Sequence, residues 1–229
     1  MAGNMATRIV NIQCAAFYEG SNYRPDSFGI KLNESLDNLF DAMPTSFALP
    51  PGAPVEIPAH ILNSESKIYS CNISRIRSDF YIQGFLRPYS SKEFYKIHSE
   101  NIMRYYNTVL SIANLNRLGF VSTFIVENDS PVTTIFKRYI KDKTLGSVSE
   151  LFVRYNNRLE ISKLGINNIT EVRDAVVKIE NLNEYSGILV VKDINTVGES
   201  KIIDLEFINT FLRRCSEIIS DANIQKAVM

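Results

Sequence analysis

Hydrophobic positions recur along this chain in two rhythms, one typical of helices and one typical of strands. The longest helical stretch runs from Ser90 to Leu115, where apolar residues return every three or four positions without a proline or glycine. Ser90 precedes Glu93 by three residues, the spacing of a capping box, in which each side chain accepts a hydrogen bond from a free backbone N–H. We therefore predict a long central helix that begins at Ser90.

The residues before this helix predict the first half of a mixed fold. Strands are indicated by period-two alternation, the helix by apolar positions that end at a proline, and the crossover by prolines that a central strand would not tolerate. The predicted elements are a strand at 8–17, a helix from Leu32 to Met43, an extended crossover at 47–58, a hairpin of 57–62 and 67–73, and a strand at 75–83.

The residues after the central helix follow a similar order. Asn156-Asn157 is predicted to supply the positive φ angles of a tight turn within a hairpin. Residues 164–178 are interpreted as a strand, a loop and a short strand. The remaining predictions are a strand at 119–127, a helix that opens at Ser130-Pro131, hairpin arms at 151–155 and 159–161, a strand at 187–195, and a closing helix at 202–220.

The two halves of the chain therefore have the same predicted layout of strand, helix, hairpin with a further strand, and helix. We predict an α+β fold in one domain, 1–229, whose pseudo-repeated halves, 7–117 and 118–221, form a mainly antiparallel sheet packed by long helices. Chance agreement of a common α+β pattern is the alternative interpretation, because no residue-by-residue repeat is evident.

Composition narrows the classes of partner. The 25 basic and 25 acidic residues give no net charge, which counts against a general nucleic-acid or anionic-membrane binder. No apolar run approaches the length of a membrane span, and no signal peptide is evident, so we expect a cytoplasmic protein without a membrane partner. The three well-separated cysteines, Cys14, Cys71 and Cys215, are expected to be reduced thiols.

No recognised catalytic motif is present, so we predict no cofactor, no metal site and no catalytic residue. The glycines are not grouped as a phosphate loop requires, and the two histidines and three cysteines lack the spacing of a zinc site. Acidic residues leave one alternative open. Asp193, together with Glu180 and Lys192, would suit a metal-dependent hydrolase or nuclease if the fold brought these side chains together.

One local concentration of charge is a candidate binding site. Lys137, Arg138, Lys141 and Lys143 lie on or just beyond the helix that is predicted to open at Ser130-Pro131. This patch is suited to phosphate or to an acidic partner. The alternative is a solvated helix face that nearby acids balance. On the last helix, Arg213 and Arg214 are candidates for contact with a partner subunit.

Four stretches of the chain resemble a family of uncharacterised bacterial proteins of similar length, sporadically distributed among genomes. The stretches are ILNSESKIYSCNISRIRSDFYIQ, KEFYKIHSENI, NRLGFVSTFIVEN and ILVVKDINTV, the last with Asp193 at an acidic position typical of the family. The chain departs from the family pattern at Ser122-Thr123 or its neighbours, where a Tyr-Asn pair is common, and near Arg213 or Arg214, where a histidine is frequent. The resemblance implies an accessory protein, in a bacterial defence or mobile-element system.

Together these observations favour a non-enzymatic binding or accessory protein. It is expected to act through sheet edges or helix faces on a protein partner, with a second copy of itself as one candidate. The metal-dependent hydrolase around Asp193 and nucleic-acid binding through the patch at 137–143 are the two alternatives.

Overall fold

The computed structural model describes residues 6–19, 24–84, 90–141, 146–178, 184–198 and 203–229 of the chain. Within them, nine strands form one sheet in which every neighbouring pair is antiparallel. The order across the sheet is β2 (Thr45–Ser46), β3 (His60–Asn63), β4 (Tyr69–Ile73), β5 (Arg77–Gln83), β1 (Thr7–Tyr18), β6 (Leu115–Glu127), β9 (Glu184–Thr196), β8 (Leu164–Lys178) and β7 (Phe152–Ile161).

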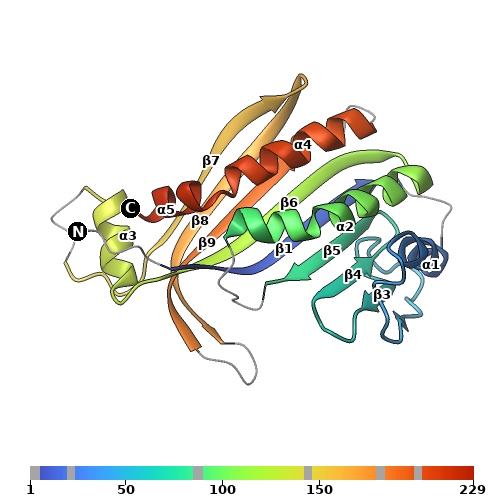
Figure 1. Ribbon diagram of the computed structural model, residues 1–229, viewed down its shortest axis with the longest axis horizontal. Helices are drawn as coiled ribbons and strands as arrows, with labels where there is room; N and C mark the ends of the chain where they lie inside the picture. The colour runs from blue at the N-terminus through green and yellow to red at the C-terminus, as the bar shows by residue number, and fades with distance from the viewer. Residues whose placement is uncertain (1–5, 20–23, 85–89, 142–145, 179–183, 199–202) are drawn as a thin grey trace.

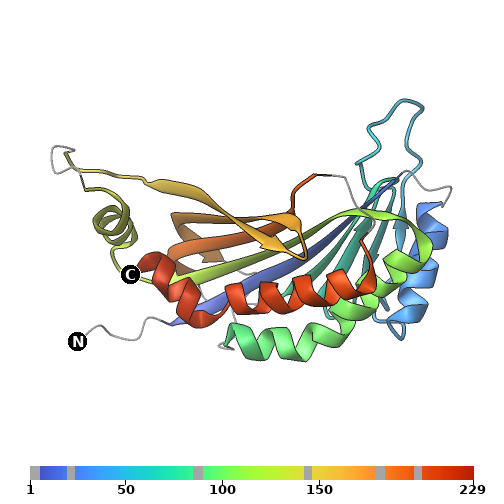
Figure 2. The ribbon, with the colours of Figure 1, turned by 90° about the horizontal axis from the view of Figure 1, so that it is seen from above.

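Five helices accompany this sheet in the described residues, so the prediction of an α+β fold with a mainly antiparallel sheet is confirmed. They are α1 (Pro25–Ser35), α2 (Ser91–Ile112), α3 (Pro131–Tyr139), α4 (Leu205–Ile218) and α5 (Asp221–Val228). Helices α2 and α4 run side by side along one face of the sheet (Figures 1 and 2). None of the described helices combines the length and the apolar composition that crossing a membrane requires.

The long helix begins as the sequence predicts. Ser90 is the residue before the first turn, its hydroxyl accepts a hydrogen bond from the Glu93 N–H at 3.1 Å, and the Glu93 carboxylate accepts one from the Ser90 N–H at 3.3 Å. Both halves of the capping box are therefore present. The helix ends at Ile112, earlier than predicted, because Leu115 already belongs to β6.

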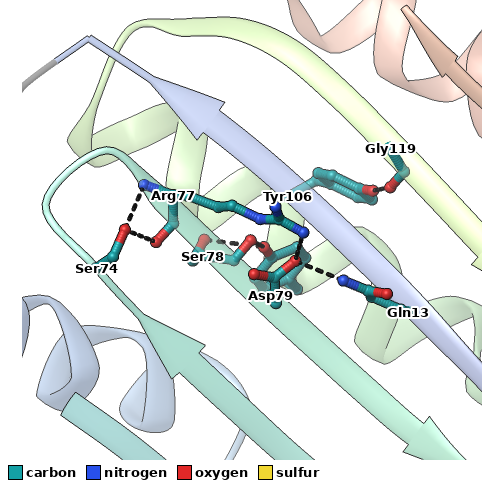
Figure 3. A network of polar contacts seen from close by, with 8 residues as sticks. Gln13, Ser74, Arg77, Ser78, Asp79, Tyr106 and Gly119 are labelled. Carbon is teal, nitrogen blue, oxygen red and sulfur yellow. Dashed lines mark hydrogen bonds and ion pairs between the residues drawn. The ribbon is translucent and has the colours of Figure 1, made fainter. Parts of the chain in front are cut away.

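Two tyrosines of α2 fasten this helix to the sheet. Both are fully buried, and their hydroxyls donate to backbone carbonyls, Tyr105 to Ser78 on β5 at 2.8 Å and Tyr106 to Gly119 on β6 at 2.9 Å. On the other face of β5, Asp79 accepts hydrogen bonds from Gln13 and Arg77 (Figure 3). Burial raises the pKa of both tyrosines, as expected where the phenolate would be desolvated.

The first helix differs from its predicted position. It starts at Pro25, a favoured first helical residue, and ends at Ser35, whereas Leu32–Met43 was predicted. Positive φ angles at Asp37 and Asn38, 55° and 57°, end the helical path.

The predicted hairpin turn at Asn156-Asn157 is wrong. These residues lie inside β7, a single strand, and the turn to β8 is at Ser162-Lys163, whose φ angles are 48° and 66°. The predicted break within 164–178 is also absent, since β8 is continuous there. Pairing with β7 on one side and β9 on the other satisfies the β8 backbone along most of its length, which overrides the weak local pattern.

The strand order is the same on both sides of the central β1–β6 pair. Beyond β1 lie β5, β4 and β3, and beyond β6 lie β9, β8 and β7. This order is the one that duplicated halves at 7–117 and 118–221 would produce, and the duplication itself stays a prediction.

Candidate anion-binding pocket

A pocket of about 330 Å³ is lined by residues of α3, α4, α5, β7, β8 and β9. These elements meet at the end of the sheet that carries the C-terminus, as the ribbon in Figure 1 shows. Four of the described side chains that line it are cations: Arg138 from α3, Lys192 from β9, Arg214 from α4 and Lys226 from α5. No carboxylate is among the described residues of its lining. We call this feature the basic pocket.

Lys192 is the most buried of the four cations, with 7% of its surface exposed. Alternation along β9 turns it toward the helices together with Val190 and Ile194, both fully buried. Its Nζ donates a hydrogen bond to the Thr170 hydroxyl on β8 at 2.7 Å. Burial lowers the pKa of Lys192, because the charged ammonium has lost hydration.

Arg138 and Lys226 come together because α3 packs against the C-terminal end of α5. The Arg138 guanidinium donates to the backbone carbonyl of Lys226 at 3.2 Å, and the neighbouring Tyr139 hydroxyl donates to the Ala227 carbonyl at 2.6 Å. Burial raises the pKa of Tyr139, so its hydroxyl remains a donor at neutral pH. These bonds hold the two cations at one side of the basic pocket.

Arg214 completes the set from α4. Its guanidinium pairs with Glu217 one turn later at 2.6 Å, with both side chains about half exposed, so the pair leaves most of the guanidinium donors free for another acceptor. Asn157, Asn168 and Asn223 add amide groups to the lining. The Asn168 Oδ1 atom is buried without a hydrogen-bond partner in the described structure, so a ligand donor would satisfy it.

One member of the predicted basic patch lines the basic pocket. Arg138 lines the basic pocket, whereas Lys137 and Lys141 are exposed and do not belong to its described lining. Lys143 lies outside the described residues. Of the predicted patch, only Arg138 joins the cations brought by other elements, and the patch itself stays a prediction.

Asp193 and Lys192 point to opposite faces of the sheet, because they are consecutive residues of β9. The Asp193 carboxylate accepts a hydrogen bond from Asn195 at 2.9 Å and is half-buried on the face without α2 and α4. Glu180 lies outside the described residues. Across the described part of the chain, no three His, Cys, Asp or Glu side chains form a group that could hold a metal ion.

The sequence analysis placed only Arg138 in a basic binding site; it named Lys192 in the alternative hydrolase site and Arg214 at a partner contact, and it did not single out Lys226. Lys192 had a readable signal, since it takes an inward position in the alternation of GILVVKDIN, where a charged residue is unusual. Arg214 was predicted to contact a partner subunit and not to line a pocket. Lys226 had no signal, because α5 is a short helix beyond the predicted closing helix.

Comparisons with known proteins add little. No protein-family model and no curated protein sequence matches the chain. A rolling circle replication initiator protein from Geobacillus stearothermophilus is a weak structural neighbour, with a TM-score of 0.32 and 10% identity over 96% of this chain and 80% of that one. The duplicated taurocyamine kinase from Schistosoma mansoni gives 0.31 and 9%, over 93% of this chain and 33% of that one. Neither likeness is strong enough to bear on function.

Proposed function

We propose that this protein is a binding protein that holds a small phosphate-bearing ligand in the basic pocket. The observation that supports the proposal is the convergence of Arg138, Lys192, Arg214 and Lys226 on one cavity whose described lining has no carboxylate. Arg138, Lys192 and Lys226 form no ion pair within the described residues, and Arg214 is neutralised only in part by the half-exposed Glu217. These cations repel one another, and an anion with two or more charges relieves that repulsion. Arginine and lysine together are the side chains that proteins use for phosphate.

The size of the pocket favours a small ligand over a polymer. About 330 Å³ is near the lower end of the range of small-molecule sites, roughly 300–1,000 Å³. The buried Asn168 Oδ1 favours a ligand that carries a hydroxyl or amino group beside its phosphate. A phosphorylated metabolite or a mononucleotide has both kinds of group.

Calorimetric titration with inorganic pyrophosphate tests the proposal. We expect saturable binding by the wild-type protein, at least tenfold weaker binding by Arg214→Gln, and unchanged binding by Arg213→Gln, which alters the neighbouring exposed arginine outside the described lining. Single-stranded oligonucleotides are the competing probe. Absence of pyrophosphate binding, or equal loss in both variants, would contradict the basic pocket as the site. Tight oligonucleotide binding lost on reversal of Lys137 and Lys141 would instead support the nucleic-acid alternative.

The wider role is also a proposal. A protein that binds a ligand without transforming it needs a partner molecule to pass on the effect of binding. We propose that this partner is a protein, first of all a second copy of the same chain, and that the protein works in the cytoplasm. The accessory role in a bacterial defence or mobile-element system, which the family resemblance implies, stays a prediction. So does the hydrolase around Asp193, which no observed geometry favours.

A further inference from the structure

The two edges of the sheet differ in how they are protected. Edge strands expose unpaired backbone N–H and C=O groups, and monomeric proteins blunt them with short strands, prolines, lysines or bulges. At one edge, β2 has only the two residues Thr45–Ser46 and follows Pro44. At the other edge, β7 runs over ten residues, contains no proline, glycine or lysine, and pairs with β8 in one unbroken register.

The hydrogen-bonding direction along β8 shows which β7 groups are free. The Gly165 carbonyl accepts from Val197, next to β9, so residues of β8 with odd numbers bond toward β9 and those with even numbers toward β7. Because Leu164 pairs with Ile161 across the turn, the odd-numbered residues of β7 bond to β8. The backbone groups of Arg154, Asn156, Arg158 and Glu160 therefore point outward, away from the sheet.

We propose that β7 pairs antiparallel with β7 of a second copy of this chain, about a twofold axis at Asn157. This register places Arg154 opposite Glu160 of the other copy, and the symmetry makes that contact twice. It also places Asn156 opposite Arg158. On the helix-facing side, Tyr155 lies opposite Leu159, so apolar surface meets apolar surface.

Neighbouring registers bring like charges together. Centring the axis on Asn156 sets Arg154 opposite Arg158 twice, and centring it on Arg158 sets that residue opposite its own copy. Like charges directly opposite destabilise a strand pair, so the sequence of β7 favours the register centred on Asn157 over these two neighbouring registers. This register gives about eight inter-strand backbone hydrogen bonds, from four paired positions with two bonds each.

The charges within one protomer leave this contact available. Glu160 pairs with Gly165 on β8, which offers it no side chain, and no ion pair of Glu160 is present within the described residues. Arg154 pairs with Glu171 at 3.0 Å but remains about half exposed, so it can bridge to a second carboxylate. Since Asn157 also lines the basic pocket, the pockets of the two protomers lie beside the same axis.

The inference deepens the proposed action through a second copy, and it does not depend on the ligand. Its test is a charge exchange measured by sedimentation velocity. Glu160→Arg creates arginine pairs with Arg154 across the axis, and Arg154→Glu creates glutamate pairs with Glu160. We expect each variant alone to dissociate at least tenfold more readily than the wild type. An equimolar mixture restores both opposite-charge contacts and should sediment as the dimer.

Arg173→Glu is the matched control, because it makes the same charge change at an exposed site on β8, one strand in from the edge. A wild-type monomer at every attainable concentration would overturn the inference, and so would a dimer that neither single variant weakens. Pyrophosphate titration of the single variants separates the two proposals. If a monomeric variant still binds pyrophosphate, the result supports the basic pocket as the binding site without the dimer. If a variant loses pyrophosphate binding but remains a dimer, the result supports the pairing of β7 without the ligand site.

Discussion

Replacing Lys192 by methionine separates ligand binding from folding more sharply than any other change in the pocket. The side chain is 7% exposed, and within the described residues its ammonium donates one hydrogen bond, to the Thr170 hydroxyl at 2.7 Å. Methionine keeps the length and flexibility of the side chain and removes the charge. Thr170→Val is added in the same chain so that no buried hydroxyl is left without its partner. Replacing both polar partners by apolar groups of similar shape has little effect on stability.

The expected magnitude follows from the interaction that is removed. Two unit charges 4 Å apart attract by about 4 kcal/mol at an effective dielectric constant of about 20, and the net effect of deleting a charged hydrogen bond is about 1.5–3 kcal/mol. A loss of about 2 kcal/mol of binding free energy makes the dissociation constant about thirtyfold larger. We therefore expect the Lys192→Met, Thr170→Val variant to bind pyrophosphate about thirtyfold less tightly and to unfold at or above the temperature of the unliganded wild type.

Thermal unfolding with and without pyrophosphate is the assay. At a ligand concentration of 100 times the dissociation constant, the wild type gains about 2.7 kcal/mol, which is about 5–10 °C in Tm for a chain of this size. The variant at the same concentration gains about 0.9 kcal/mol, or about 2–3 °C. Lys137→Met is the control, because this lysine is exposed on α3 outside the described lining, and it should keep the full shift. A full shift in the double variant would refute the role assigned to Lys192.

Four further predictions concern pH and the fold. Because burial lowers the pKa of Lys192, the folded state binds fewer protons than the unfolded state between that pKa and the ordinary value of 10.5. Across this interval, the contribution of Lys192 to the free energy of unfolding of the unliganded protein should rise with pH, which urea titrations measure. The affinity for pyrophosphate should fall over the same interval, because Lys192 loses its charge. Ser90→Ala removes the cap of α2 and should cost about 1 kcal/mol in urea unfolding, with less loss for Ser90→Gly. Lys163→Gly relieves a φ of 66° and should raise the free energy of unfolding by about 1 kcal/mol. Gly29→Ala would place its Cβ 2.4 Å from the His60 ring and should destabilise the protein by about 1–3 kcal/mol; an unchanged unfolding midpoint would show that α1 can shift away from β3.

Local signals were enough where one segment determines its own structure. Ser90 and Glu93 predicted the start of α2, and the uninterrupted helical spacing of apolar residues predicted that the helix is long. Alternation likewise identified most strands. These features depend on neighbours within a few residues, so they can be read from the sequence.

Tertiary contacts decided the places where the prediction was wrong. Asn156-Asn157 is a good turn sequence, but pairing with Asn168 and Ile169 on β8 keeps it extended, and the turn moves to Ser162-Lys163 despite their positive φ angles. The basic pocket, likewise, could not be predicted from local sequence. Its four cations come from α3, β9, α4 and α5, so their convergence depends on the packing of elements far apart in the chain.

A crystal structure of the protein grown with pyrophosphate would show whether the basic pocket holds an anion. We expect electron density for pyrophosphate in the basic pocket, with its oxygens bonded to Arg138, Lys192 and Arg214. Pyrophosphate bound at another surface, with the basic pocket holding only water, would contradict the proposal.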